Sequence, residues 1–302
     1  MLILGSHMSI AGGFAQAAAK TGQEFGANAM QLFTKSPRGG IVKPIDPADA
    51  ESFKALCAQY KIQYVIAHSA YLLNFAKSVK SLPWMKQNIL TDFQRLHMLG
   101  GKGVIVHIGK SLDNDRPEAI QNVIDNAKYI VDQTQKLTHT GYDGVENSAA
   151  PNGLEYILEN TAGQGSEIGY KLEELAQVWK GLHGFNPRIR SCIDTAHVWG
   201  AGYDISDQPN AEKFLHDYDE AIGLKTVSCF HFNDAKKECG SKTDRHENIG
   251  DGMIGNGMMG LEGLATIAKY AHKHQTPLIL ETPEKDGKTH LDDLKTVRKI
   301  LE

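Results

Sequence analysis

Tyr64-Val65-Ile66-Ala67-His68 is a short run of β-branched and aliphatic residues that ends on a histidine, and the arrangement recurs along the chain. Val104-Ile105-Val106 leads into His107 in the same way, and Leu278-Ile279-Leu280 leads into Glu281. Helix-like stretches rich in Ala, Lys and Glu separate these runs. This alternation is the pattern of βα units around a parallel sheet.

Eight such runs occur, at residues 2–5, 29–33, 64–67, 104–106, 156–158, 189–193, 227–232 and 278–280. Apolar residues at three- and four-residue spacing predict outer helices at 47–60, 82–99, 117–137, 172–182, 211–222 and 261–274. Residues 5–8 are expected to form a strand-to-helix turn, and 138–151 and 250–260 to form connections rich in turn residues. Eight βα units close a barrel, so we predict a single α/β (β/α)₈ TIM barrel over residues 1–302.

Composition sets limits on the class of protein. The 302 residues are 41% hydrophobic and 23% charged, enough for a large core. The four cysteines lack zinc-ribbon spacing, which favours a reducing compartment. No apolar run is long enough for a membrane span or a signal peptide, so we expect an intracellular protein. The net charge of -4 argues mildly against nucleic acid, although three bound divalent ions would change it to +2.

Ionisable residues occupy six of the strand ends. In a TIM barrel these ends converge on one face, where active sites lie. A single such residue would be explained equally well as a core histidine bonded to a carbonyl or as a carboxylate capping the next helix. Six together favour a metal site, and imidazole with carboxylate favours zinc, with manganese possible. The six residues are His68, His107, Glu159, Asp194, His231 and Glu281.

Further candidate ligands lie one step outward. His197 follows Asp194 by three residues, and Asp244 and His246 lie on one side of an extended segment. The alternative for the second pair is a solvated cluster, because residues 236–247 are rich in charge.

Five ordered motifs carry a resemblance to a known family. The chain closely resembles endonuclease IV, the family 2 apurinic/apyrimidinic (AP) endonucleases. The likeness extends over essentially the whole chain. The motifs are residues 68–74, 158–165, 192–197, 231–236 and 244–250.

The resemblance implies a cluster of three zinc ions. It assigns His68 and His107, with Glu159, to one ion. Glu159 would bridge to a second ion that Asp194, His231 and Glu281 also hold, and His197, Asp244 and His246 would hold the third. The attacking hydroxide is expected near Glu159 and Glu281, the two catalytic candidates.

The sequence departs from the family pattern at two positions. Ile108 replaces a usual proline after His107, which is expected to make that turn less rigid. Ala196 stands where the family commonly has cysteine. Neither change removes a ligand.

The implied substrate is double-stranded DNA with abasic sites or blocked 3′ ends. The family cuts 5′ to the abasic site and leaves a 3′ hydroxyl and a 5′ deoxyribose phosphate. Arg38 matches its inserting arginine, and Tyr71 and Leu72 match its wedge; the alternative is that Tyr71 packs on the barrel rim and Arg38 is a solvated cation. The role of His7 stays open between supporting a ligand and contacting phosphate. We expect a monomer.

Two other functions compete with this interpretation. Sugar isomerases and epimerases share the barrel and a Glu, Asp, His and Glu metal site. They need no third ligand set, so His197, Asp244 and His246 favour the nuclease. A DNA-binding barrel without catalysis would tolerate the loss of ligands, and none is lost.

Overall fold

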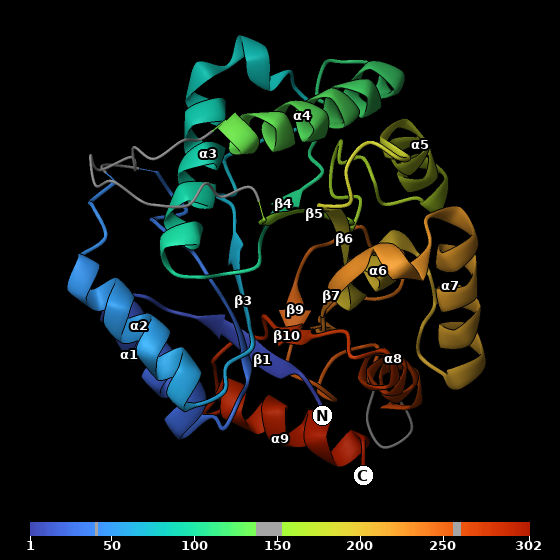
Figure 1. The fold of residues 1–302 in the computed structure, drawn as a ribbon. Helices are drawn as coiled ribbons and strands as arrows, with labels where there is room; N and C mark the ends of the chain where they lie inside the picture. The colour runs from blue at the N-terminus through green and yellow to red at the C-terminus, as the bar shows by residue number, and fades with distance from the viewer. Residues whose placement is uncertain (40–41, 137–152, 256–260) are drawn as a thin grey trace.

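The computed structural model describes residues 1–39, 42–136, 153–255 and 261–302, and it shows a closed barrel (Figure 1). Eight parallel strands follow one another around it in the order β1-β10-β7-β6-β5-β4-β3-β2, which confirms the predicted (β/α)₈ class. They are β1 (Leu4–Met8), β2 (Ala29–Leu32), β3 (Tyr64–His68), β4 (Gly103–His107), β5 (Glu155–Glu159), β6 (Ile189–Asp194), β7 (Val227–His231) and β10 (Leu278–Leu280).

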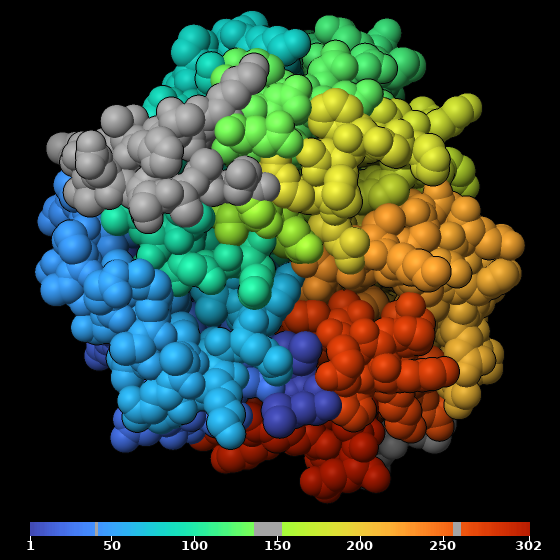
Figure 2. Space-filling model, in the orientation of Figure 1, coloured from blue at the N-terminus to red at the C-terminus, as the bar shows by residue number. Residues whose placement is uncertain are grey.

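The barrel closes where its first and last strands meet. Leu4 of β1 pairs with Leu278 of β10 in parallel register. Figure 2 accordingly shows blue N-terminal atoms against red C-terminal atoms. A short antiparallel pair, β8 (Asp234–Ala235) and β9 (His246–Glu247), lies outside the barrel sheet.

Helices surround the barrel (Figure 1). Six of them match predicted segments, and α5 and α8 have the predicted bounds. Three helices were not predicted. Helices α1 and α6 are too short for a clear periodic signal, whereas α9 has a recognisable start in the capping box of Thr289 and Asp292. They are α1 (Phe14–Ala19), α2 (Pro47–Gln59), α3 (Pro83–Met98), α4 (Arg116–Lys136), α5 (Leu172–Leu182), α6 (Thr195–Ala201), α7 (Gln208–Ala221), α8 (Leu261–His274) and α9 (His290–Ile300).

The expected turn at residues 5–8 is wrong. These residues belong to β1, whose ladder with β2 pairs Gly5 with Ala29 and His7 with Gln31. Gly-Ser-His has little strand propensity of its own, but pairing on both edges of a closed barrel outweighs local preference. His7 therefore lies within a barrel strand.

Side chains in the barrel interior form layers, because alternate residues of a strand point to the same face. One buried cluster holds a single apolar or thiol residue from each of seven strands, and its members are Ala29, Ile66, Ile105, Ile157, Cys192, Cys229 and Ile279. The residue two positions further along each strand also faces inward. That next layer lies at the carboxyl end of the barrel and consists of polar residues.

Two predicted connections fall partly or wholly on residues that the structure does not describe. Residues 138–151 lie outside the described residues, as do 256–260 of the predicted 250–260 loop. The described part of that loop is fixed by the buried Asp234, whose carboxylate accepts bonds from the backbone N–H groups of Gly250, Gly252 and Ile254. Within the described ranges, no helix has the length and apolarity that a bilayer crossing needs.

The close approach of β1 and β2 generates a testable prediction. A methyl group on Gly5 would lie 1.7 Å from the carbonyl oxygen of Ala29. Gly5→Ala should therefore lower the free energy of unfolding by about 1–3 kcal/mol, because the two strands must separate. Chemical denaturation measures this value. Gly153→Ala is the control, since no atom of the described residues lies within 4 Å of its added Cβ, and equal stability of the two variants would contradict the prediction.

Candidate metal centre

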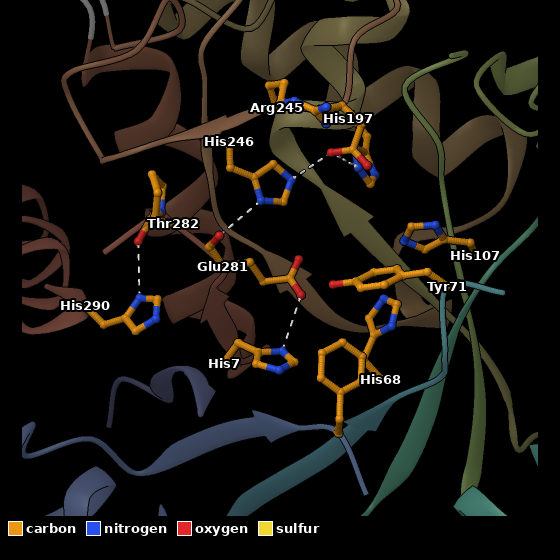
Figure 3. A pocket seen from close by; sticks show the side chains of 13 residues that line it. His7, His68, Tyr71, His107, His197, Arg245, His246, Glu281, Thr282 and His290 are labelled. Atoms are coloured by element: carbon orange, nitrogen blue, oxygen red, sulfur yellow. Dashed lines mark hydrogen bonds and ion pairs between the residues drawn. The ribbon is translucent and has the colours of Figure 1, made fainter. Parts of the chain in front are cut away.

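All eight barrel strands contribute one polar residue to the inward-facing layer at the mouth. Glu281 directly follows β10, and the other seven lie within their strands. Several of them line a cavity of about 540 Å³ (Figure 3). The eight are His7, Gln31, His68, His107, Glu159, Asp194, His231 and Glu281.

Glu159 lies at the centre of this layer and is fully buried. Its carboxylate is 2.7 Å from His231 Nδ1 and 3.2 Å from both His68 Nε2 and His107 Nε2. Burial alone would raise the pKa of Glu159, but the positive charges of His231 and His107 outweigh it and hold this pKa well below its ordinary value. Glu159 is therefore a buried anion that requires cations around it.

A second group of donors shares Glu159 with the first. His231 Nδ1 is 3.1 Å from Glu281 Oε2 and 3.8 Å from Asp194 Oδ2. Donor atoms of Glu159, Asp194, His231 and Glu281 all lie within 4.8 Å of one another. Burial lowers the pKa of His231, but Glu281 and Glu159 raise it well above its ordinary value. The four side chains are close enough to hold one ion together.

A third group lies beside the second. Donor atoms of Asp194, His197 and His246 are within 4.8 Å of one another. Asp244 Oδ1 is 3.2 Å from His197 Nε2 and 3.4 Å from His246 Nε2. Asp194 thus links the second and third groups, and Glu159 links the first and second. The sequence predicted the link through Glu159 but not the one through Asp194. All nine predicted ligands meet in one cluster.

Helix α6 explains the three-residue spacing of Asp194 and His197. Asp194 ends β6 and caps α6, because its Oδ1 accepts a 2.8 Å bond from the His197 backbone N–H. Its other oxygen accepts a 2.8 Å bond from Asn233 Nδ2. Capping of the next helix was the alternative considered for a strand-end carboxylate, and Asp194 both caps α6 and lies in the cluster. The cap orients the carboxylate and starts the first turn that carries His197.

Hydrogen bonds fix which nitrogen of each ring is free. Ring Nδ1 atoms lie 2.8 Å from the Ser69 carbonyl in His68 and 2.9 Å from the Asn160 carbonyl in His197. The same atom of His246 lies 3.2 Å from the Glu281 carbonyl. A carbonyl oxygen can only accept, so each Nδ1 donates and each Nε2 of a neutral ring carries a lone pair.

These lone pairs face carboxylate oxygens. The buried Nε2 atoms of His197 and His246 make no hydrogen bond within the described residues, although both lie near Asp244. A lone pair facing an anion is repulsive unless a proton or a metal ion lies between them. Neutral imidazole and carboxylate, with the second ring nitrogen anchored, are the ligand set of divalent first-row metals. The residues present therefore fit metal ions.

Cys192 is an unexpected neighbour of the cluster. Its Sγ lies within 4.8 Å of donor atoms of Glu159 and His231. Burial, followed by the adjacent Cys229 thiol, raises the pKa of Cys192 well above its ordinary value. Because the thiolate is the form that binds metal, Cys192 belongs to the apolar layer below the cluster.

The predicted recognition residues lie on two neighbouring loops at the rim. Tyr71 and Leu72 are 64% and 58% exposed, a large exposure for adjacent apolar side chains. Tyr71 lines the cavity, and its ring lies 5.4 Å from Phe33 and 5.7 Å from His68. Arg38 is exposed and is not among the described residues that line the cavity. A Cβ on the next residue, Gly39, would lie 3.6 Å from Leu72 Cδ1, so the two loops are in contact.

The turn after His107 has Ile108 where the family usually has proline, and packing and a hydrogen bond hold it. Ile108 is fully buried, and Gly109 has a φ of 121°, which a residue with a side chain rarely adopts. The Lys110 backbone N–H donates a 2.9 Å bond to Asn74 Oδ1. Packing and this bond take over the role expected of proline. Ala196, the other departure, is buried in α6.

Gln31 and Arg245 belong to the site and had no assigned role in the sequence. Gln31 is fully buried and contacts two candidate ligands, His231 and Glu281. Gln31 is the one polar residue of β2, and it lies two residues after Ala29, so both side chains face the barrel interior. A polar residue at an inward-facing position is the sequence signal for its role. Arg245 lies between two ligands in sequence and lines the cavity (Figure 3).

Comparison with known proteins identifies the family. Residues 17–259 match the family described as xylose isomerase-like TIM barrel. Probable endonuclease 4 of Chlorobium phaeobacteroides is 33% identical over 94% of this chain and 93% of its own. The protein of the same name from Thermosipho melanesiensis is 33% identical over 100% of this chain and 99% of its own. The chain belongs to the endonuclease IV family.

Solved structures agree with this assignment. Endonuclease IV from Thermus thermophilus superposes with a TM-score of 0.76 at 27% identity, covering 99% of this chain and 98% of its own. A D-tagatose 3-epimerase-like protein, at 17% identity and a TM-score of 0.68 over 99% of this chain and 96% of its own, shares the fold. The barrel is thus common to the endonuclease IV family and to sugar epimerases.

The charges of the cluster predict how the metal-free protein responds to pH. The pKa values of His107, His197 and His231 are raised because the effect of nearby carboxylates outweighs burial. Their stabilisation is complete below the ordinary pKa of 6.5 and is lost as pH rises through the raised values. The pKa values of Glu159 and Glu281 are lowered, so their contribution to stability is lost only as pH falls below the ordinary range of a carboxyl group.

The stability of the chelated protein should therefore fall as pH rises from about 6 to 8. Over the same range the metal-loaded protein should bind its ions more tightly, because fewer protons compete for the histidine nitrogens. The difference in Tm between metal-loaded and chelated protein should widen over this range. Scanning calorimetry of both forms measures it. A difference that stays constant or narrows would contradict the assignment of these side chains to a metal centre.

Proposed function

We propose that this chain is a metal-dependent AP endonuclease that hydrolyses the phosphodiester bond 5′ to an abasic site. The products would be a 3′ hydroxyl and a 5′ deoxyribose phosphate. As a member of the endonuclease IV family the chain is a hydrolase of the nuclease class. The observation that carries the proposal is the single cluster formed by all nine candidate ligands.

We propose three zinc ions, one for each donor group. His68 and His107 would hold one ion with Glu159, and the group of Glu159, His231 and Glu281 with Asp194 would hold the second. His197, Asp244 and His246 would hold the third, beside Asp194. Bound zinc supplies an activated water at neutral pH and neutralises charge on phosphoryl and leaving oxygens.

The chain's own residues prepare the site for a phosphodiester. Glu159 and Glu281 have pKa values held well below the ordinary range, since the effect of His231 outweighs burial, so both are anionic at neutral pH. They are proposed to hold the ions and to orient the nucleophile. Arg245 brings a permanent cation to the cavity wall and suits a phosphate oxygen.

Recognition of an abasic site requires groups that replace a missing base. Tyr71 and Leu72 present exposed apolar surface beside the ligands His68 and His107. Arg38 lies on the adjoining loop. We propose that these three residues fill the gap in double-stranded DNA, and that blocked 3′ ends reach the same centre without them.

Epimerase activity is the competing function, because the barrel is shared. A sugar site of that kind needs one or two metals. The buried Nε2 atoms of His197 and His246, which face Asp244 and make no hydrogen bond among the described residues, would then have no metal ion to bind. The third donor group favours the nuclease.

Glu281→Gln tests the proposed reaction. An amide is a weak metal ligand, so nicking of an abasic duplex should fall about 100-fold or more, equivalent to roughly 3 kcal/mol at the transition state. Steady-state nicking and elemental analysis, with close to three ions expected in the wild type, are the measurements. Glu262→Gln, on the exposed start of α8, is the control. Wild-type protein that does not nick, or a Glu281 variant within tenfold of it, would refute the proposal.

The recognition loops give a separate prediction. Arg38→Ala with Tyr71→Ala should reduce nicking of an internal abasic site much more than removal of a 3′-terminal phosphate. Stacking contacts are worth about 1–3 kcal/mol each, and a frayed end needs few of them. The two rates are compared in the same preparation. Equal losses on both substrates would mean that the two side chains support the metal centre instead.

A further inference from the structure

Gln31 is a neutral side chain among charged ones. It lies on β2, is fully buried, and bonds to three residues of the polar layer. Its Nε2 lies 2.9 Å from His7 Nδ1 and also donates to Glu281 Oε1. Its Oε1 lies 2.7 Å from His231 Nε2. One carboxamide thus uses both of its N–H groups and its oxygen.

The contact with Glu281 fixes the orientation of this amide. A carboxylate oxygen can only accept, so the NH₂ group of Gln31 must face Glu281. The reverse orientation would place the amide oxygen against the carboxylate and repel it. The other two contacts then have defined donors.

The His231 ring is oriented by the amide oxygen. Because that oxygen only accepts, His231 Nε2 carries a hydrogen and donates it to Gln31. Nδ1 is left to face Glu159, Glu281 and Asp194, at 2.7, 3.1 and 3.8 Å. Gln31 therefore selects the ring nitrogen that meets three carboxylates.

The His7 ring is set by the amide nitrogen. His7 Nδ1 accepts from Gln31, so the hydrogen of the neutral ring lies on Nε2. Phe33, with its ring centroid 4.6 Å away, restricts rotation. His7 lines the cavity, and among the described residues no hydrogen-bond partner faces its Nε2. This N–H group is free to bind a ligand.

We propose that Gln31 is a positioning residue that fixes the tautomers of two imidazoles at once. It directs His231 Nδ1 to the metal, and it makes His7 Nε2–H a fixed donor to a phosphoryl oxygen of the DNA backbone. The proposal rests on the proposed function for the identity of the metal and the phosphate. It adds a supporting residue from β2 and a substrate contact from β1.

Metal retention tests the first half. Gln31→Leu keeps the side-chain size but removes the acceptor for His231, so the protein should lose zinc to a competing chelator about 10- to 100-fold more readily. Gln121→Leu on the exposed face of α4 is the matched control and should behave as wild type. Unchanged zinc retention in folded Gln31→Leu would overturn this half of the proposal.

Histidine tautomers test the second half, without metal or DNA. In chelated protein labelled with ¹⁵N-histidine, two-bond NMR correlations should show His7 as the Nε2–H tautomer, assigned by its loss in His7→Phe. Gln31→Met has a similar length but cannot donate to His7, so the hydrogen of the neutral ring should move to Nδ1, which lies 3.7 Å from Glu281 Oε1. This variant also serves if Gln31→Leu does not fold. An Nδ1–H ring in the wild type, or an unchanged ring in Gln31→Met, would overturn the assignment.

Substrate binding completes the test. His7→Phe should retain zinc and yet bind abasic duplex about 10-fold more weakly, the effect of one hydrogen bond to a charged group. Unchanged binding would remove the phosphate contact. Failure of wild-type protein to nick abasic DNA refutes the proposed function alone, because the tautomer of His7 does not depend on that activity.

Discussion

The ionised carboxylate of Glu159, buried at the centre of the barrel mouth, is the constraint on which the rest of the site depends. An isolated buried anion is too costly to persist, so cationic or metal-bound neighbours must surround it. Three imidazoles approach it within 3.2 Å, and each ring comes from a different strand. The cluster is therefore a requirement of charge balance as well as a place for chemistry.

Strand alternation explains how one fold supplies both a dry interior and a charged mouth. Along each strand the inward-facing positions change from an apolar layer to a polar layer within two residues, as in Ile157 and Glu159 or Ile66 and His68. The lower layer excludes water from beneath the cluster. This lowers the local dielectric and strengthens every interaction among the charges above it.

Much of this arrangement could be predicted from the sequence, for a physical reason. An ionisable residue at the end of an apolar run stands out, so the candidate ligands at six strand ends could be predicted together with the barrel. Gln31 was missed because an uncharged amide does not stand out until its three partners, distant in sequence, are brought together. The bounds of β1 were wrong because strand pairing, which is a tertiary effect, outweighed the weak propensity of Gly5 and Ser6. The turn chemistry that replaces proline after His107 depends on Asn74, which local sequence does not reveal.

The pairing of the first strand with the last has a consequence for biosynthesis. Glu281 follows β10, which closes the barrel between β1 and β7. Gln31 on β2 bonds to Glu281 across 250 residues of chain. A nascent chain emerging from the ribosome therefore has most of the ligands but not the closed cluster until its final strand is made. The assembled cluster would mark a polypeptide whose synthesis has passed β10, so an incompletely translated chain would lack the side chain of Glu281 and the contacts that it makes.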